Sequence, residues 1–326
     1  MRIFIYEHTC AAAADESPAA VSLRAEGAAM QRAIVEDMQR VPSVEVLVPS
    51  YPVKEPTFRA AARNADYSLI IAPEFAGILL ERCRWVLEEG GRLLGPAPEA
   101  IAVTADKFAM FRWWQAHGVP TPETQILEPA AQKTKFLAYA SGSVICKQRD
   151  GAGCSFARIF AQANWPRLRS RLLQETEGLS LILQPYIQGL AASVALLVGP
   201  KHCLALPPAA QHIDAGENLK YVGGEVPLPE PLALRAERIA RRAIAGVSGL
   251  LGYIGVDVVL GNDGRDWAIE INPRLTTSYV GLRALAEFNL AEAMLAVVQG
   301  KNPREWSWRR ATVRFRADGA CLAASC

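Results

Sequence analysis

The first hundred residues alternate short apolar runs with longer stretches of helical periodicity. Residues 67–72 read Tyr-Ser-Leu-Ile-Ile-Ala, an apolar run typical of a parallel strand that is buried on both faces. The predicted strands are 2–6, 44–49, 67–72 and 93–95, the predicted helices are 20–38 and 75–89, and a loop of small residues is expected at 9–14. Because strands and helices alternate, residues 1–103 are predicted to form an α/β domain with a parallel sheet.

After residue 103 the pattern predicts a mixed α+β region. Thr104 is expected to be the N-cap of a helix over 104–117. Further helices are predicted at 132–139, 165–175, 232–250 and 290–299, and strands at 143–148, 156–160, 181–186, 193–198 and 202–206. The Pro-rich stretch 226–231 is expected to be an exposed connection, and 301–326 shows no pattern that predicts an element.

A β-hairpin is predicted where Asp263-Gly264 separates two apolar runs, because a type I′ turn needs φ > 0 at both central residues. Centring the turn on this pair places Asp257 opposite Glu270. Side chains alternate faces along a strand, so Asn272 points the same way as Glu270. The pattern therefore brings two carboxylates and an amide oxygen to one face of an otherwise apolar hairpin.

Like charges on directly opposed residues repel, since their Cβ atoms are only about 5 Å apart. A hard divalent cation would explain the arrangement, because Mg²⁺ is bound by one or two carboxylates together with substrate phosphates. Asp257, Glu270 and Asn272 are thus candidate ligands for Mg²⁺, or for Mn²⁺ in its place. The alternative is a polar, solvent-facing side of an ordinary hairpin.

Composition narrows the class of protein. The 326 residues are 51% hydrophobic and 21% charged with a net charge of +2, which indicates a globular protein of two or three modest domains. Nothing in that balance favours nucleic acid or a membrane surface as a partner. Seven scattered cysteines without a CxxC pair, and no apolar segment near the roughly 20 residues of a membrane span, predict a cytoplasmic protein. A homodimer is expected only from its general frequency.

Two lysines are notable for their surroundings. Lys107 follows Asp106 at the start of a predicted helix, and Lys147 lies on an apolar strand that runs into a loop with Gly151, Gly153 and Ser155. Burying an unpaired ammonium is costly, and an anionic ligand would supply its counter-charge. The small loop could close its backbone N–H groups over phosphate oxygens. It is neither a P-loop nor a dinucleotide fingerprint, and an ordinary hairpin connection stays open as an alternative.

The segment Gln184-Pro185-Tyr186-Ile187 is a third candidate for ligand binding. A strand that carries a proline leaves backbone groups without a ladder partner, and these groups can bind the edge of a purine. An edge strand with a bend is the alternative.

In this order and spacing, the motifs over roughly 100–285 resemble those of the ATP-grasp superfamily. The resemblance implies an ATP-grasp fold, with the α/β domain at 1–103 followed by two ATP-clamping subdomains at 104–187 and 188–326. It implies that Lys107 and Lys147 bind the ATP phosphates under the 151–155 loop, and that Pro185 and Ile187 contact adenine. It further implies that Asp257, Glu270 and Asn272 hold Mg²⁺, and that Arg274 stabilises the transferred phosphoryl group.

Two departures from the superfamily's pattern concern the site. After Gly189 many members have a Glu that binds ribose, whereas this chain reads Leu190-Ala-Ala-Ser193. Some dipeptide-forming members carry an arginine where this chain has Gly255. Both contacts must be lost or supplied by other residues.

A narrower resemblance, to the tyramine–glutamate ligases of methanofuran biosynthesis, rests on four segments. They are Ile5–Thr9, Leu23–Met30, Ile71–Glu74 and Asn272–Arg283. Glu7, Glu26 and Glu74 of these segments are expected near strand or helix ends, where a substrate amine could be met, although the simpler expectation is that each is solvated.

The resemblance implies an ATP-dependent carboxylate–amine ligase that works through an acyl phosphate on small-molecule substrates. Such chemistry asks the protein for positioning and charge neutralisation, which two lysines, a metal site and Arg274 would supply. A kinase or carboxylase on the same nucleotide site is the alternative enzyme class. A non-catalytic nucleotide-binding protein is the third possibility, favoured only by the missing ribose Glu.

Overall fold

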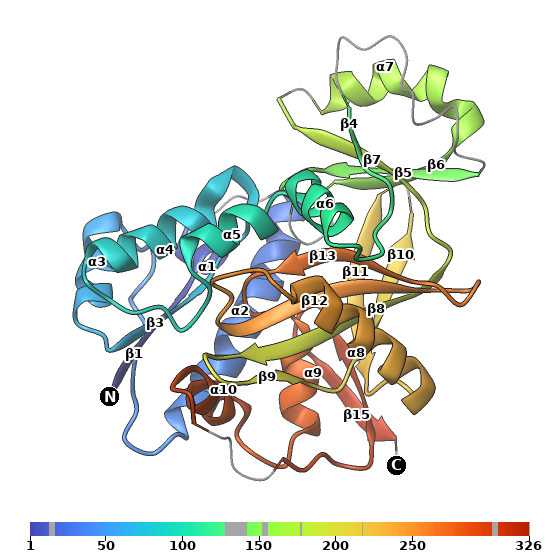
Figure 1. The fold of residues 1–326 in the computed structure, drawn as a ribbon. Helices are drawn as coiled ribbons and strands as arrows, with labels where there is room; N and C mark the ends of the chain where they lie inside the picture. The colour runs from blue at the N-terminus through green and yellow to red at the C-terminus, as the bar shows by residue number, and fades with distance from the viewer. Residues whose placement is uncertain are drawn as a thin grey trace.

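The computed structural model describes residues 1–12, 17–127, 142–151, 156–176, 178–216, 218–301 and 306–325. Its strands form three sheets, of three, four and eight strands. Figure 1 shows the four-stranded sheet and its helix α7 at one end of the molecule, set apart from the two larger layers. The predicted combination of a parallel α/β region with antiparallel α+β regions is confirmed. The boundaries at 103/104 and 187/188 stay a prediction.

The N-terminal sheet is parallel, in the order β2-β1-β3. Its strands are β1 (Arg2–Glu7), β2 (Glu45–Leu47) and β3 (Tyr67–Ile71), and its helices are α1 (His8–Ala11), α2 (Pro18–Gln39), α3 (Glu55–Arg63), α4 (Ile78–Glu88), preceded by the 3-10 turn η1 (Phe75–Gly77), and α5 (Pro98–Thr104). One face of the sheet packs Phe4 and Tyr6 edge-on against Phe58 of α3, and the other face packs against α2.

Three local predictions in this region are wrong. The expected loop at 9–14 begins with α1, because the Glu7 side chain accepts a hydrogen bond from the Cys10 amide and caps a helical turn. The expected strand at 93–95 is reduced to a single bridge between Ser68 and Leu93. Thr104 does not begin a helix but ends α5.

The next helix, α6 (Lys107–Ala116), begins after Asp106. The Asp106 carboxylate accepts hydrogen bonds from the Phe108 and Ala109 amides at 2.9 and 3.1 Å. Asp106 is therefore the N-cap, and it places Lys107 at the first helical position.

The four-stranded sheet is antiparallel, in the order β4-β7-β5-β6. Its elements are β4 (Gln125–Ile126), β5 (Ser143–Gln148), β6 (Ala157–Ala161), η3 (Gln162–Asn164), α7 (Trp165–Glu175) and β7 (Leu181–Pro185). The bounds of β5 and α7 agree with the predicted ones. The predicted helix at 132–139 lies outside the described residues.

The eight-stranded sheet has the order β13-β12-β8-β10-β11-β14-β15, and β9 also pairs with β8. Its strands are β8 (Gly189–Val198), β9 (Cys203–Ala205), β10 (Ala209–Ala215), β11 (Leu219–Val226), β12 (Gly252–Gly261), β13 (Asp266–Asn272), β14 (Thr312–Arg316) and β15 (Cys321–Ser325), and its helices are α8 (Glu230–Ile244), α9 (Ser278–Leu285) and α10 (Leu290–Val298). β14 and β15 thus lie within 301–326, where no element was predicted. The connection at 226–231 is not exposed throughout, since Val226 and Leu228 are buried.

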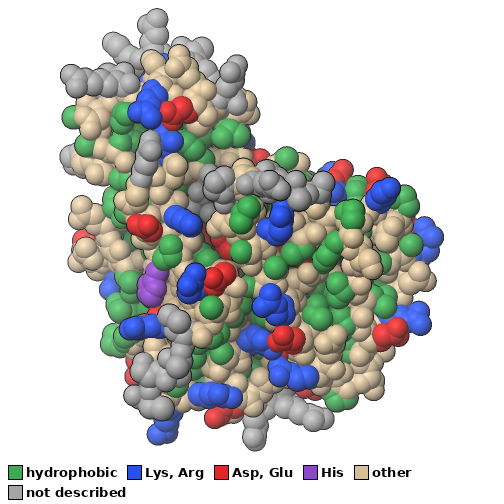
Figure 2. All heavy atoms as spheres, turned by 180° about the vertical axis from the view of Figure 1, so that it is seen from behind, with side chains coloured by type: hydrophobic (Ala, Val, Ile, Leu, Met, Phe, Trp, Pro, Cys, Tyr) green, Lys and Arg blue, Asp and Glu red, His purple; other side chains and the backbone are tan. Residues whose placement is uncertain are grey.

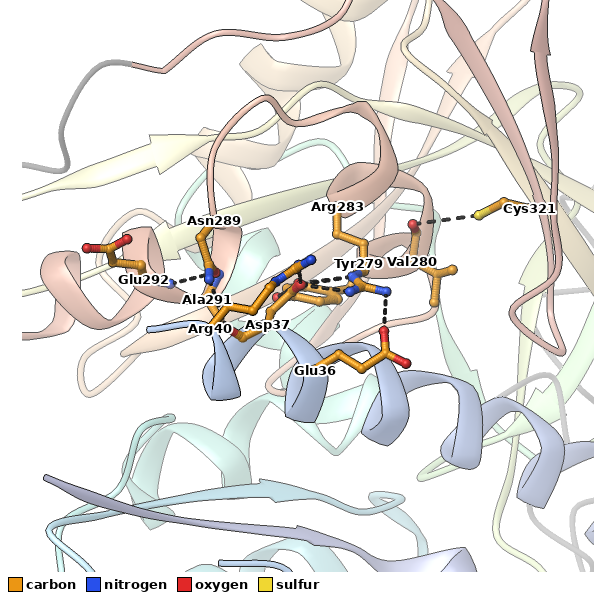
Figure 3. A network of polar contacts seen from close by, with 10 residues as sticks. All are labelled: Glu36, Asp37, Arg40, Tyr279, Val280, Arg283, Asn289, Ala291, Glu292 and Cys321. Atoms are coloured by element: carbon orange, nitrogen blue, oxygen red, sulfur yellow. Dashed lines mark hydrogen bonds and ion pairs between the residues drawn. The ribbon is translucent and has the colours of Figure 1, made fainter. Parts of the chain in front are cut away.

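Helix α2 lies between the parallel sheet and the large sheet. Its apolar residues share one core with α9, α10 and one face of the large sheet, while α6 and α8 cover the opposite face. Figure 3 shows the polar contacts that fix α2 in this place: buried Asp37 accepts from the Tyr279 hydroxyl at 2.7 Å and from Arg283 at 2.8 Å. These hydrogen bonds, together with apolar packing, therefore fix the position of α2 against α9.

Charged side chains of both signs are spread over one face of the molecule (Figure 2). Figure 2 shows Lys and Arg side chains interspersed with Asp and Glu over the face opposite that of Figure 1. Among the described helices, none is both long enough and apolar enough to cross a lipid bilayer.

Candidate active site

A cavity of about 430 Å³ is lined by strands of the four-stranded and eight-stranded sheets and by helices α2 and α6. Nearly all of the predicted site residues line it. They are Lys107, Lys147, Gly151, Gln184, Pro185, Tyr186, Ile187, Asp257, Glu270, Asn272 and Arg274. Gly153 and Ser155 lie outside the described residues. The fold thus gathers into one cavity predicted site residues as far apart in the chain as Lys107 and Arg274.

The hairpin β12–β13 differs from the prediction at its turn. Gly261 pairs with Arg265 through a 2.7 Å hydrogen bond, so the loop has three residues, and only Gly264 has positive φ (+82°). Such a loop is a type I turn followed by a left-handed glycine rather than a type I′ turn. The pairing next to the turn is therefore shifted by one residue, as in Val258 opposite Ala268.

A β-bulge restores the predicted pairing further along. The register shifts between Asp257 and Val258, so that Ile269 is the extra residue, and Asp257 then lies opposite Glu270. The opposition of the two carboxylates is thus confirmed, although by two irregularities that cancel rather than by a regular hairpin. Ile269 lines the cavity, and Ala268 takes its place in the core.

Asp257 is surrounded by neutral hydrogen-bond donors. The Gln211 amide donates to one carboxylate oxygen at 2.9 Å, and the Asn272 amide donates to the other at 3.0 Å. Ser193, opposite Asp257 in β8, also hydrogen-bonds its carboxyl group. Burial and the adjacent charge of Glu270 nevertheless raise the pKa of Asp257 to about 7. Gln211 was missed by the sequence analysis because β10 carries no recognisable pattern there.

Glu270 has charged partners instead. The Lys107 ammonium lies 3.1 Å from its carboxylate and also donates to the Gly151 carbonyl at 2.6 Å. Burial raises the pKa of Glu270, but the charges of Lys107, Lys147 and Arg274 outweigh this effect and hold the pKa below its usual range. Lys107 thus ties the start of α6 both to the metal-ligand candidate and to the start of the glycine-rich loop.

Lys147 is buried on β5, where its backbone pairs with Ala157 of β6 and Ile182 of β7. Strand alternation turns its side chain away from the apolar core of this sheet, which contains its neighbour Cys146. Lys147 therefore presents its charge to the same cavity as Lys107.

The candidate segment Gln184–Ile187 consists of the last two residues of β7 and the two residues after it. The Gln184 side chain is buried and donates to the Thr124 hydroxyl at 2.8 Å, and the Tyr186 amide donates to the Ser143 carbonyl at 2.9 Å. Among the described residues, the Ile187 amide has no backbone hydrogen bond. β7 lies between β4 and β5, but β4 pairs only with Ile182 and Leu183, so in the described part of the chain Gln184 and Pro185 have β5 as their single neighbouring strand.

Arg274 binds a residue of the N-terminal region. Its guanidinium donates to both carboxylate oxygens of Glu74, at 2.8 and 3.2 Å, and to the Leu275 carbonyl at 3.2 Å. The Glu74 carboxylate raises the pKa of Arg274 against the opposing effect of burial. The expectation that Glu7, Glu26 and Glu74 are solvated is wrong, because all three are buried.

Steric crowding explains why position 255 is a glycine. A Cβ built there would lie 2.5 Å from the Thr276 methyl group, which is too close for any side chain without movement. An arginine at this position, as in some dipeptide-forming members of the superfamily, is therefore incompatible with Thr276. Any compensating cation must come from another element.

The fold and the cavity together define the class of protein. The ATP-grasp domain family matches residues 104–278, and the pre ATP-grasp 3 domain family matches residues 38–101. The chain belongs to the ATP-grasp family.

Individual relatives show which ATP-grasp proteins the chain is similar to. The chain is 31% identical over 236 residues to tyramine–L-glutamate ligase of Methanocaldococcus jannaschii, a match that spans 71% of this chain but only 64% of that relative. It is 29% identical to D-alanine–D-alanine ligase of Gloeobacter violaceus, over 55% of this chain and 61% of that one. A solved structure of an Archaeoglobus fulgidus protein described as an ATP-grasp superfamily member shares the fold, with a TM-score of 0.71, 24% identity and coverage of 96% and 92%.

Proposed function

We propose that the chain is an ATP-dependent carboxylate–amine ligase that forms an amide through an acyl phosphate. The observation that carries the proposal is the opposed pair Asp257 and Glu270, facing Lys107 across one cavity that also holds Lys147 and Arg274. Similarity to two amide-forming ligases supports the reaction class.

ATP is the proposed nucleotide substrate. Lys107 and Lys147 would bind its phosphates, because both ammonium groups line the cavity beside Gly151. The main chain at Pro185 and Ile187 would contact adenine, with Gln184 and Tyr186 shaping this end of the cavity. None of residues 190–193 after Gly189 carries a carboxylate, so other groups would have to bind the ribose.

Mg²⁺ is the proposed metal, with Mn²⁺ as a substitute, and the residues fit it. Asp257, Glu270 and Asn272 offer only oxygen ligands, and the raised pKa of Asp257 reports a repulsion that a cation would relieve. Among the described residues no group of three or more His, Cys, Asp or Glu could hold an ion, so substrate phosphates would complete the coordination. When bound, the ion would neutralise phosphate charge.

The chain's own residues would act mainly through position and charge. The two lysines would hold the phosphates so that the substrate carboxylate attacks the terminal phosphorus, and Arg274 would neutralise charge on the transferred group. The resulting acyl phosphate reacts with an amine, and phosphate leaves. Walls from the small and large sheets would exclude water from this intermediate.

L-Glutamate and an amine such as tyramine are the substrates we propose from the similarity to tyramine–L-glutamate ligase. A role in building a methanofuran-type cofactor, a cytoplasmic location and a homodimer remain proposals.

ADP release in the presence of panels of carboxylates and amines tests the function. Turnover that needs both a carboxylate and an amine would support ligation. An alcohol as the acceptor would indicate a kinase, and bicarbonate as the co-substrate would indicate a carboxylase. Nucleotide binding without stimulated turnover would leave a non-catalytic role. The variant Asp257→Asn serves as the inactive control.

A further inference from the structure

One buried carboxylate in the cavity has no part in the proposed nucleotide site. Glu26 lies on α2, is only 8% exposed and lines the cavity together with Arg274 and Ser278. Within the described part of the chain, Glu26 makes no hydrogen bond and no ion pair. An ionised carboxylate buried in this way is costly unless a cationic or hydrogen-bonding group reaches it.

The neighbouring buried glutamates show that this is a property of Glu26 and not of the region. Glu74 is paired with Arg274, and Glu7 accepts from the Thr9 hydroxyl and the Cys10 amide. Both therefore have structural partners. Glu26 alone of the three is left facing the cavity.

Arg274 links Glu26 electrostatically to the proposed phosphate-binding residues. The charges of Lys107, Lys147 and Arg274 lower the pKa of Glu270, whereas those of Arg274 and Lys220 act on Glu26. Arg274 is the group that both carboxylates share. Glu26 and Glu270 thus line the same cavity, and the charge of Arg274 acts on both of them.

Part of the cavity wall is apolar. Leu219 and Tyr221 of β11 line the cavity, as do Ile213 and Ala215 of β10. A ligand with one cationic end and an apolar body would satisfy both Glu26 and this wall.

We propose that Glu26 binds the ammonium group of a primary amine substrate with an apolar body and accepts one proton from it. This inference rests on the proposed ligase function. Proton transfer from R–NH₃⁺ to the Glu26 carboxylate leaves R–NH₂, whose lone pair forms the C–N bond at the acyl carbon. The C–O bond to phosphate breaks, phosphate leaves with that electron pair and takes the second nitrogen proton, and Glu26 releases the first proton to solvent after the amide departs.

The electrostatics of Glu26 suit a base near neutral pH. Burial raises its pKa to about 7, opposed by the charges of Arg274, which follows β13, and Lys220 on β11. No charged group on α2 itself contributes. A base with this pKa can take a proton and release it again within one turnover.

Hydroxylamine provides the decisive test, because it is a neutral nucleophile at pH 7.5 that needs neither ammonium binding nor deprotonation. The full-length protein is assayed with Mg-ATP and the carboxylate that stimulates ADP release, L-glutamate first. The nucleophile is either hydroxylamine or a primary amine from a panel headed by tyramine. Hydroxamate reports acyl phosphate formation, and amide reports the complete reaction.

In Glu26→Gln, kcat/KM for the amine should fall by about 100-fold or more, the contribution typical of a positioned base. Hydroxamate formation should stay within about twofold of wild type, since the neutral nucleophile does not use Glu26. The defect with the amine should shrink as the pH approaches the pKa of the amine itself. Glu26→Asp, which keeps the charge, should recover part of the activity.

Glu36→Gln is the matched control, because Glu36 is on the same helix but pairs with Arg283 away from the cavity. It should match wild type in both assays. An equal loss of hydroxamate and amide in Glu26→Gln, or no loss of either, would overturn the inference. Wild-type hydroxamate formation without stimulation by any primary amine would overturn it too, while leaving ATP-dependent carboxylate activation intact. A wild type that forms no hydroxamate with any carboxylate would overturn the ligase function as well.

Discussion

The β12–β13 hairpin and the surroundings of Arg274 each bring together two acidic side chains whose charges are compensated to different degrees. At the hairpin, Asp257 and Glu270 oppose each other, and lysines compensate only Glu270. Around Arg274, Glu74 pairs with the guanidinium, whereas Glu26 makes no hydrogen bond or ion pair with a described residue. In both places one carboxylate is compensated by the protein and the other is not. The uncompensated member, Asp257 or Glu26, is the one whose pKa is raised to about 7, and such groups mark places where a ligand is expected to complete the charge balance.

The largest effect is expected at the hairpin. Asp257→Asn or Glu270→Gln should lower kcat for ADP release by about 10³-fold or more, because each removes a metal-binding carboxylate. Thermal unfolding without nucleotide should show Asp257→Asn to be as stable as wild type, since the change removes a repulsive charge. Retained turnover in either variant would remove the metal assignment.

Breaking the compensated pair around Arg274 should affect stability. Glu74→Gln leaves Arg274 buried without its carboxylate, which should lower the free energy of unfolding by about 3 kcal/mol. Arg274→Gln should have a similar cost, and the double variant should cost less than both together. Urea denaturation of the four proteins measures the coupling, and strictly additive costs would mean that the ion pair contributes nothing.

Replacing Glu26, the uncompensated carboxylate, should instead raise the free energy of unfolding. The pKa of Glu26 is raised from 4.5 to about 7 in the folded protein, so the folded state binds its proton more tightly. This contribution to stability is complete below pH 4.5 and is lost as the pH rises through 7. Glu26→Gln should therefore be more stable than wild type by about 1–3 kcal/mol at pH 8 and equal to it near pH 4.5. A stability difference that does not change with pH would show that Glu26 is neutralised by a partner.

The smallest effect is expected beside the hairpin. Gly255→Ala brings a methyl group against Thr276 and should cost about 1–2 kcal/mol. Thr276→Ser removes the opposing methyl but keeps the hydroxyl that lies 3.1 Å from the Tyr253 hydroxyl, so it should recover most of the loss. Calorimetry of the single and double variants checks this. Failure of Thr276→Ser to recover stability would place the strain elsewhere.

Periodicity predicted the elements with a clear local signal. β5 and α7 have their predicted bounds, and β1, α2, β3 and α10 lie within a few residues of theirs. β10, β11 and β14 were not predicted. β10 reads Ala-Ala-Gln-His-Ile-Asp-Ala and β11 contains Gly223-Gly224, so neither carries a clear strand signal. β14 does alternate, with Val313 and Phe315 buried, but its signal is only five residues long. Thr104 was predicted to be an N-cap because threonine is a common capping residue, but Asp106, two positions later, caps the helix.

The candidate site was predictable where motifs carried it and not where tertiary contacts did. Asp257, Glu270 and both lysines follow from local pattern and spacing. The pairing of Glu74 with Arg274 joins residues 200 positions apart, and no local signal announces it. Glu26 was expected to be solvated because a polar position on a long helix usually is. Its burial results from its place on α2, which packs between two sheets.

The extra residue in β13 has a consequence for how this hairpin can change. A three-residue loop and the bulge at Ile269 each displace the strands by one step, and together they return Asp257 to Glu270. Since Gly261 pairs with Arg265 across that loop, a ladder that ran on without the bulge would place Ile269 and not Glu270 opposite Asp257. The bulge is therefore required by the three-residue loop in a hairpin of this length, so that homologous hairpins of the same length should have both features or neither.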